Sequence, residues 1–196
     1  YLALADAFFG YGAEPVTQPG VAPGTAELEA GYALGRFEGL NNEPDMEAPW
    51  TYHYAGRPDR TAEIVHHIVH QQFGVGRGGL PGNDDSGGLS SWYVWASLGV
   101  FPAAGQNLFF VNAPSFRRAE IAVVGGRFLI ETEGFVEPEA GGAVQYVQSA
   151  ALNGLPLERS WISGDEFHGG GTLTVRLGAE PTDWGRRDRP PSHPQA

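Results

Sequence analysis

The sequence predicts an α+β fold in which helices come first and a set of short strands follows. Residues 59–73 carry an apolar stripe of helical period that includes Ile64, Ile68 and Phe73, typical of a helix with one buried face. Beyond residue 105, short segments rich in β-branched and aromatic residues alternate with Gly, Asn and Pro turns, the pattern of antiparallel strands. The 29 glycines and 15 prolines also favour many turns over a helical bundle.

The helical part is expected to extend over residues 1–104. Pro58 precedes the longest predicted helix, and Ser90 or Ser91 can cap the start of the last one. Residues 40–49 contain Asn, Pro and several acids and are interpreted as an irregular functional loop. The predicted helices cover residues 1–9, 26–34, 50–55, 59–73 and 92–99.

Residues 105–184 are expected to form a small antiparallel β domain. Asn153 and Gly154 are the pair that a two-residue hairpin turn prefers. Residues 185–196 are polar and rich in proline and are interpreted as a flexible tail. The predicted strands cover residues 107–111, 118–124, 127–132, 143–152 and 171–177.

The composition excludes several classes of function. A net charge of −11 argues against a nucleic-acid partner, because phosphate binding needs clustered Lys and Arg. No apolar run is long enough to span a membrane. The absence of cysteine excludes disulfides and thiolate metal sites but leaves the compartment open. Because the chain begins without Met and inside a predicted helix, we expect a fragment, so a missing signal peptide says nothing about secretion.

The first acidic segment is Asn41-Asn42-Glu43-Pro44-Asp45. Carboxylate and amide oxygens are the hard ligands that suit Ca²⁺, and Pro44 helps to hold a bent backbone. The spacing is not that of an EF-hand. The residues alone therefore leave two interpretations open, a cation site and an acidic turn that caps a helix.

The second acidic segment is Gly82-Asn83-Asp84-Asp85-Ser86-Gly87-Gly88. Two adjacent carboxylates repel each other unless a cation, donors or water offset their charge. Placed before a helix, such a turn can keep one carboxylate ionised as a general base. The alternative is a solvated turn followed by a helix cap.

Aromatic residues and histidines lie close to both segments in the sequence. Trp50 and Trp92 are typical of sugar-binding sites when they flank carboxylates, although core packing explains them equally well. His66 and His70 are four residues apart on a predicted helix, which is the spacing of a metal pair, but a solvated helix face is the simpler interpretation. His53 lies closer to the first acidic segment.

Residues 37–184 contain a series of distinctive sequence blocks. The first are Asn42-Glu43-Pro44-Asp45, Tyr54-Ala55-Gly56-Arg57-Pro58, Leu80-Pro81-Gly82-Asn83-Asp84-Asp85-Ser86-Gly87 and Ser91-Trp92-Tyr93-Val94. The C-terminal blocks are Tyr146-Val147-Gln148-Ser149-Ala150, Leu152-Asn153-Gly154 and Ser160-Trp161-Ile162. Several blocks in the right order are far more specific than any one of them. In order and spacing, these blocks resemble glycoside hydrolase family 92.

This resemblance implies a Ca²⁺-dependent, inverting exo-α-mannosidase with an (α/α)6 catalytic barrel behind an N-terminal β-sandwich. Residues 1–104 then correspond to the last helices of that barrel, followed by the antiparallel β region. Asp85 takes the place of the general base. Asn83 stands where the family often has a second acid, so its role is polar. The resemblance assigns Asn42 and Glu43 to the metal and Asp45, Asn83, Asp84 and Trp50 to the substrate.

One departure from the family pattern limits this assignment. The family carries its general acid in a Glu-Gly-Asn-Ala-Trp type block upstream of Asn42, and this sequence has no such block. We therefore expect a C-terminal fragment, inactive by itself, whose partners are α-mannoside glycans and the missing sandwich and barrel of the same enzyme. The resemblance implies secretion or a periplasmic location. The alternative function is a non-catalytic carbohydrate- or calcium-binding module.

Overall fold

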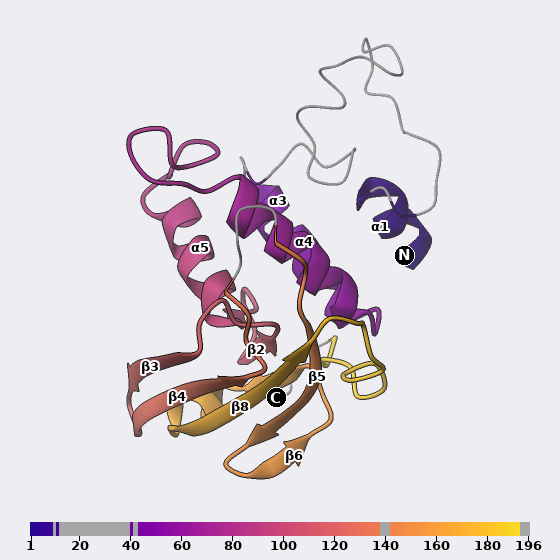
Figure 1. Cartoon of the computed structure of the whole chain (residues 1–196), viewed down its shortest axis with the longest axis vertical. Coiled ribbons are helices and arrows are strands. Elements are labelled where there is room, and N and C mark those ends of the chain that lie inside the picture. The colour runs from indigo at the N-terminus through magenta and orange to yellow at the C-terminus, as the bar shows by residue number, and fades with distance from the viewer. Residues whose placement is uncertain (10, 12–39, 41–42, 138–141, 193–196) are drawn as a thin grey trace.

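The chain folds into a helical part and two β-sheets that share one mixed α+β architecture (Figure 1). The structure is a computed structural model and describes residues 1–9, 11, 40, 43–137 and 142–192. The predicted helix over residues 26–34 lies outside these ranges. The described helices are α1 (Leu2–Phe9), α3 (Glu43–Glu47), the 3-10 helix η1 (Ala48–His53), α4 (Pro58–Gln71), α5 (Gly88–Leu98) and α6 (Gly164–His168).

Three helices differ from the sequence-based expectation, and one of them, α6, lies within the region expected to contain only strands. The segment interpreted as an irregular loop contains α3, in which Pro44 is the second residue. Proline is tolerated in the first helical turn because the N–H group it lacks has no partner there, so it permits this helix. Helix α5 begins at Gly88, four residues before the predicted start at residue 92. In the described part of the chain, no helix combines the length and hydropathy needed to cross a bilayer.

The strands form a three-stranded and a five-stranded sheet. The smaller sheet has the order β1 (Val100–Pro102), β2 (Leu108–Val111) and β7 (Trp161–Ser163), all antiparallel. The larger sheet has the order β3 (Arg118–Val123), β4 (Gly126–Glu133), β8 (Gly171–Gly178), β5 (Tyr146–Leu152) and β6 (Leu155–Leu157).

The larger sheet is mixed, and the expectation of a purely antiparallel arrangement is wrong at one pair. Strand β8 is antiparallel to β5 and parallel to β4. It lies between two strands of opposite direction, so it can be antiparallel to only one of them. The predicted hairpin is confirmed, because Asn153 (φ +52°) and Gly154 (φ +78°) join the paired residues Leu152 and Leu155.

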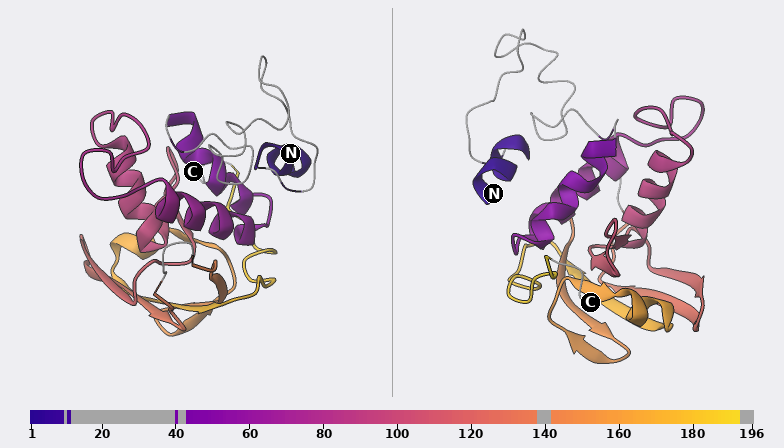
Figure 2. Two further views of the ribbon diagram at one scale, coloured as in Figure 1. Left: turned by 45° about the horizontal axis from the view of Figure 1, so that its top comes forward. Right: turned by 180° about the vertical axis from the view of Figure 1, so that it is seen from behind.

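Strand β2 separates two hydrophobic cores. Leu108 and Phe110 belong to the helical core, whereas Phe109 and Val111 belong to the core against the larger sheet. All four residues are buried because alternate side chains of a strand point to opposite faces. The smaller sheet is therefore a middle layer. Helices α4 and α5 lie on the same side of the larger sheet (Figures 1 and 2).

The segment interpreted as a flexible tail makes defined contacts over its first residues. The indole Nε1–H of Trp161 donates to the carbonyl oxygen of Asp188 over 3.3 Å, and Gly185 forms an isolated bridge with Arg159. Arg186 lies 3.8 Å from the carboxylate of Asp59 on α4. Residues 185–192 thus lie against the fold, and residues 193–196 are outside the described ranges.

Candidate active site

The fold places α3, which contains the described part of the first acidic segment, next to α5, which follows the second acidic segment. The indole Nε1–H of Trp92 on α5 donates to the carbonyl oxygen of Met46 on α3 over 2.8 Å. The Met46 side chain also packs against the start of α5. Its Cε atom would lie 3.3 Å from the Cβ atom of any larger residue at position 88. Trp92 is buried, so the protein interior shields this hydrogen bond from water. The bond fixes the spacing between α3 and the N-terminus of α5.

The second acidic segment is a tight turn with three consecutive residues in the left-handed region. The φ angle is +46° at Asp85, +65° at Ser86 and +98° at Gly87. Glycine adopts such angles freely, but aspartate and serine do so at an energetic cost, so surrounding structure must hold them there. Backbone strain of this kind concentrates at functional sites.

Asp84 makes the hydrogen bonds that hold this turn. Its backbone carbonyl accepts from the N–H groups of Gly87 (3.1 Å) and Gly88 (2.6 Å), and its Oδ1 atom accepts from the N–H of Ser90 (2.8 Å). The N-cap residue of α5 is Gly87, which has no side chain to offer, and the Asp84 carboxylate takes over that task. Capping by Ser90 or Ser91 is therefore wrong: the Ser91 hydroxyl donates to the Gly87 carbonyl instead.

Asp85 and Asn83 are exposed on either side of Asp84. Among the described residues, no hydrogen bond to the Asp85 carboxylate is found. Both of its oxygens therefore face solvent and can accept a proton from a water molecule or contact a ligand. Asp84, in contrast, is half-buried and has one oxygen engaged by the fold.

The first acidic segment is the helix α3. It carries Glu43 and Asp45, whereas Asn42 lies outside the described residues. Over the ranges that the structure describes, no three His, Asp or Glu side chains form a group able to hold a metal ion. Sequence reasoning overlooked Glu47, one helical turn beyond Glu43, where burial raises the pKa of the carboxyl group. The Glu-x-x-x-Glu spacing becomes informative only once the segment is known to be helical.

Trp50 lies in the helical core at 1% exposure. Its ring stacks on Phe101 with centroids 4.2 Å apart and on His53 at 6.0 Å. Core packing, the alternative that the sequence left open, describes this position. Contact with a sugar would require the surrounding core to open.

The histidines do not form a metal site in the described fold. His53 is fully buried, its Nδ1 atom lies 2.9 Å from the Ser160 hydroxyl, and burial lowers its pKa to about 3, which keeps it neutral. His66 and His70 have ring centroids 4.5 Å apart. They are half-buried rather than solvated, because His66 Nε2 lies 2.9 Å from the Gly142 carbonyl and both rings line a small cavity beside α4.

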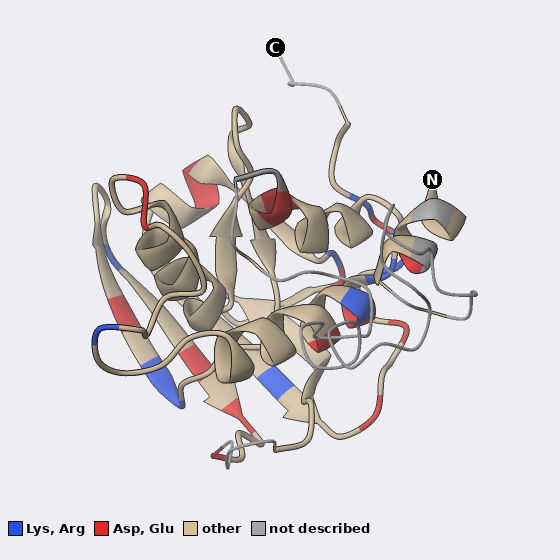
Figure 3. Cartoon of the chain, turned by 90° about the horizontal axis from the view of Figure 1, so that it is seen from above, with Lys and Arg blue, Asp and Glu red and all other residues tan. Residues whose placement is uncertain are grey.

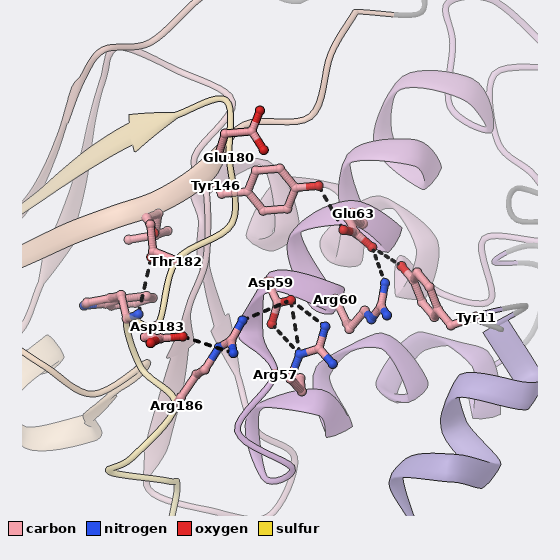
Figure 4. A network of polar contacts seen from close by, with 12 residues as sticks. Tyr11, Arg57, Asp59, Arg60, Glu63, Tyr146, Glu180, Thr182, Asp183 and Arg186 are labelled. Carbon is pink, nitrogen blue, oxygen red and sulfur yellow. Dashed lines mark hydrogen bonds and ion pairs between the residues drawn. The ribbon is translucent and has the colours of Figure 1, made fainter.

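A polar network surrounds the first turns of α4 (Figure 4). Glu63 accepts hydrogen bonds from the hydroxyls of Tyr11 and Tyr146, which come from the N-terminal region and from β5. Arg60 pairs with the same carboxylate at 3.2 Å. At the start of the helix, Arg57 donates to Asp59, whose carboxylate is almost fully buried. The network ties α4 to the sheet and so supports the neighbouring helices.

Acidic residues are spread over helices, strands and loops rather than gathered around one surface (Figure 3). The charge distribution therefore does not by itself mark the site. The candidate site is defined by the contact between α3 and α5 and by the strained turn at Asp85.

Comparison with known proteins identifies relatives of this chain. A protein of Arthroderma benhamiae named an uncharacterized secreted glycosidase is 39% identical over 157 residues, which cover 78% of this chain and 20% of that protein. The chain thus spans about a fifth of the length of this curated relative.

Solved structures share the fold. The family GH92 alpha-mannosidase BT3965 from Bacteroides thetaiotaomicron superposes with a TM-score of 0.75 at 22% identity, over 97% of this chain and 24% of that one. The family GH92 inverting mannosidase BT2199 from the same organism gives a TM-score of 0.72 at 24% identity, over 95% and 25%. The sequence model described as the glycosyl hydrolase family 92 catalytic domain matches residues 6–179, and the chain therefore belongs to glycoside hydrolase family 92.

Proposed function

We propose that this chain is the C-terminal part of a Ca²⁺-dependent, inverting exo-α-mannosidase that hydrolyses terminal α-mannosides of glycans. The observation that carries the proposal is the exposed Asp85 carboxylate, held on a strained turn beside the acidic helix α3. The names of the structural relatives support the substrate class, and one of them is named an inverting enzyme.

The rest of the enzyme belongs to the same proposal. Because the chain spans about a fifth of its curated relative, the remaining barrel helices and an N-terminal β-sandwich come from further polypeptide. The described helices then form the end of an (α/α)6 barrel. The name of the curated relative supports a secreted enzyme.

In this mechanism Asp85 acts as the general base. It removes a proton from a water molecule as the water oxygen forms a bond to the anomeric carbon. The bond between that carbon and the glycosidic oxygen breaks, and a general acid protonates the departing oxygen. In inverting enzymes the acid and base lie about 6.5–9.5 Å apart to leave room for the water. The acid belongs to the missing part, so the isolated chain has no turnover.

The donor chemistry of the first acidic segment fits calcium, since carboxylate and amide oxygens are its usual ligands. Asn42 and Glu43 would hold the ion, with further ligands from outside the described residues. A bound Ca²⁺ supplies a positive charge that can engage two adjacent sugar hydroxyls and favour a distorted ring. We assign Asp45 and Asn83 to contacts with the substrate, whereas Asp84 has one carboxylate oxygen engaged by the N–H of Ser90.

The stereochemistry of the product tests the proposal. The natural protein that carries this chain should release β-mannose first from an α-mannoside, which proton NMR distinguishes before mutarotation. Asp85→Asn should abolish this release, whereas Asp165→Asn, an exposed acid on α6, should not. Release of α-mannose, or full activity of Asp85→Asn, would reject the proposal. If the chain alone binds Ca²⁺ or mannose by calorimetry while the longer protein shows no hydrolysis, it is a binding module.

A further inference from the structure

We infer that Asp84 is a positioning residue whose capping of α5 holds Asp85 in its left-handed conformation and leaves the Asp85 carboxylate free. The inference rests on the proposed role of Asp85 as general base. It assigns different roles to two adjacent aspartates. The Asp84 carboxylate holds the turn, and the Asp85 carboxylate takes the proton from the attacking water.

The hydrogen bonds of Asp84 span the whole turn. Its carbonyl oxygen accepts from the N–H groups of Gly87 and Gly88, and its Oδ1 atom accepts from the N–H of Ser90. Residues 85–87 therefore lie between Asp84 and the residues that donate to it. The first N–H groups of a helix have no partner within the helix. Here Gly87 offers no capping side chain. The Asp84 carboxylate instead accepts a hydrogen bond from the N–H of Ser90, the third residue of α5.

This arrangement accounts for the backbone strain next to it. Asp85 and Ser86 are the described non-glycine residues of this turn with positive φ, and such angles persist only where other contacts impose them. Asp84 supplies those contacts at the place where they occur. Without its carboxylate the turn would relax, and the direction of the Asp85 side chain would change.

The arrangement also explains why only one carboxylate stays free. The helix N-terminus carries partial positive charge and stabilises the carboxylate that caps it. Asp84 is half-buried and engaged there, while Asp85 is exposed.

Three substitutions in the natural protein that carries this chain separate geometry from charge. Asp84→Asn keeps the Oδ1 acceptor and removes the charge. Asp84→Ala removes both, and Asp84→Glu keeps the charge but displaces the acceptor. We expect kcat to fall at least about 30-fold for Ala and Glu, with KM within about threefold, because small misplacements of a reacting group cost up to about 100-fold. Asn should lose no more than about fivefold in kcat.

The contrast between Asn and Ala gives a readout that a purely structural role would not change. If Asp84→Ala loses kcat while Asp84→Asn keeps it, at an unchanged KM in both, the Oδ1 acceptor for the Ser90 N–H is the group that positions Asp85. Equal losses of kcat in Asn and Ala, or a rise in KM as the main effect, would overturn the inference and indicate a charge or substrate contact instead.

Ser163→Ala is the matched control. It removes the capping box of α6 and should lower stability without lowering kcat. Should Asp84→Ala fail to fold, Asp84→Glu carries the same test.

Hydrogen exchange at the Ser90 amide distinguishes this inference from the proposed function. Asp84→Ala should speed that exchange at least about tenfold, since the amide loses its acceptor. Unchanged exchange at Ser90 would reject the capping role even if Asp85 is the base. Faster exchange together with full activity of Asp85→Asn would instead reject Asp85 as the base. The capping role of Asp84 would stand, but its role in positioning a catalytic group would be rejected.

Discussion

The two acidic segments lie side by side but are built on different physical principles. The first is a short regular helix, α3, followed directly by η1, and it depends on neighbours such as Trp92 for its position. The second is an irregular turn stabilised by the hydrogen bonds of Asp84, with a strained positive φ angle at Asp85. The comparison teaches that the segment proposed to bind Ca²⁺ uses ordinary helical backbone, whereas the proposed general base lies on a turn enforced by local hydrogen bonds.

The largest expected effect separates the chemical roles of the segments. Asp85→Asn in the natural enzyme should lower kcat by about 10²–10⁴, the usual contribution of a general base. Added Ca²⁺ should not restore it, because the cation segment is intact. Steady-state kinetics across a Ca²⁺ titration measures both. Recovery of activity with Ca²⁺ would show that Asp85 serves the metal rather than the water.

The next effect concerns the support of the first segment. His53, at the end of η1, has a pKa of about 3 in the fold against an ordinary value of 6.5. Between these values the unfolded state binds more protons, so the free energy of unfolding falls as pH is lowered from 6.5 towards 3. By pH 5 the loss should reach about 2 kcal/mol, at about 1.4 kcal/mol per pH unit.

Chemical denaturation of the chain between pH 7 and 5 measures this dependence while most carboxylates stay ionised. His53→Asn should flatten the curve, whereas substitution of the exposed His168 should leave it unchanged. An identical slope in His53→Asn would contradict a neutral buried imidazole.

The third effect addresses the metal. Glu43→Gln should weaken Ca²⁺ binding at least about tenfold, since a neutral oxygen replaces a charged one at a site for a hard cation. Saturating Ca²⁺ should restore most of kcat, in contrast to Asp85→Asn. Calorimetry of the natural protein after chelator treatment measures the affinity. Unchanged affinity in Glu43→Gln would remove the first segment from the metal site.

The smallest effect tests the link between the segments. Trp92→Phe removes the hydrogen bond to Met46 and should lower the free energy of unfolding by about 1 kcal/mol. Trp184→Phe is a matched control, because its indole donates to the Leu157 carbonyl within the β region. Both variants should lose similar stability by urea denaturation. Only Trp92→Phe should also lower kcat, and equal kinetics in the two variants would show that the link does not set the geometry.

The sequence by itself determined the α+β class of the fold and located the acidic turn at residues 82–88. Helical periodicity located α4, and short β-branched segments located β2, β3, β4, β5 and β8, because both signals depend on which local face is buried. Asn153 and Gly154 fixed a hairpin because a two-residue turn needs residues that tolerate positive φ. The ordered motifs identified the family, which the catalytic-domain match confirms.

Only the tertiary structure decided how these pieces meet. Helix α3 forms where the sequence suggested a loop, since Pro44 in a first turn permits a helix but does not signal one. The parallel pairing of β8 with β4 depends on where a distant strand inserts, which local propensity does not encode. The division between Asp84 and Asp85 is decided in the same way. Two neighbouring aspartates are equivalent in the sequence. In the fold, the Ser90 N–H group donates to the carboxylate of Asp84, whereas the carboxylate of Asp85 stays exposed.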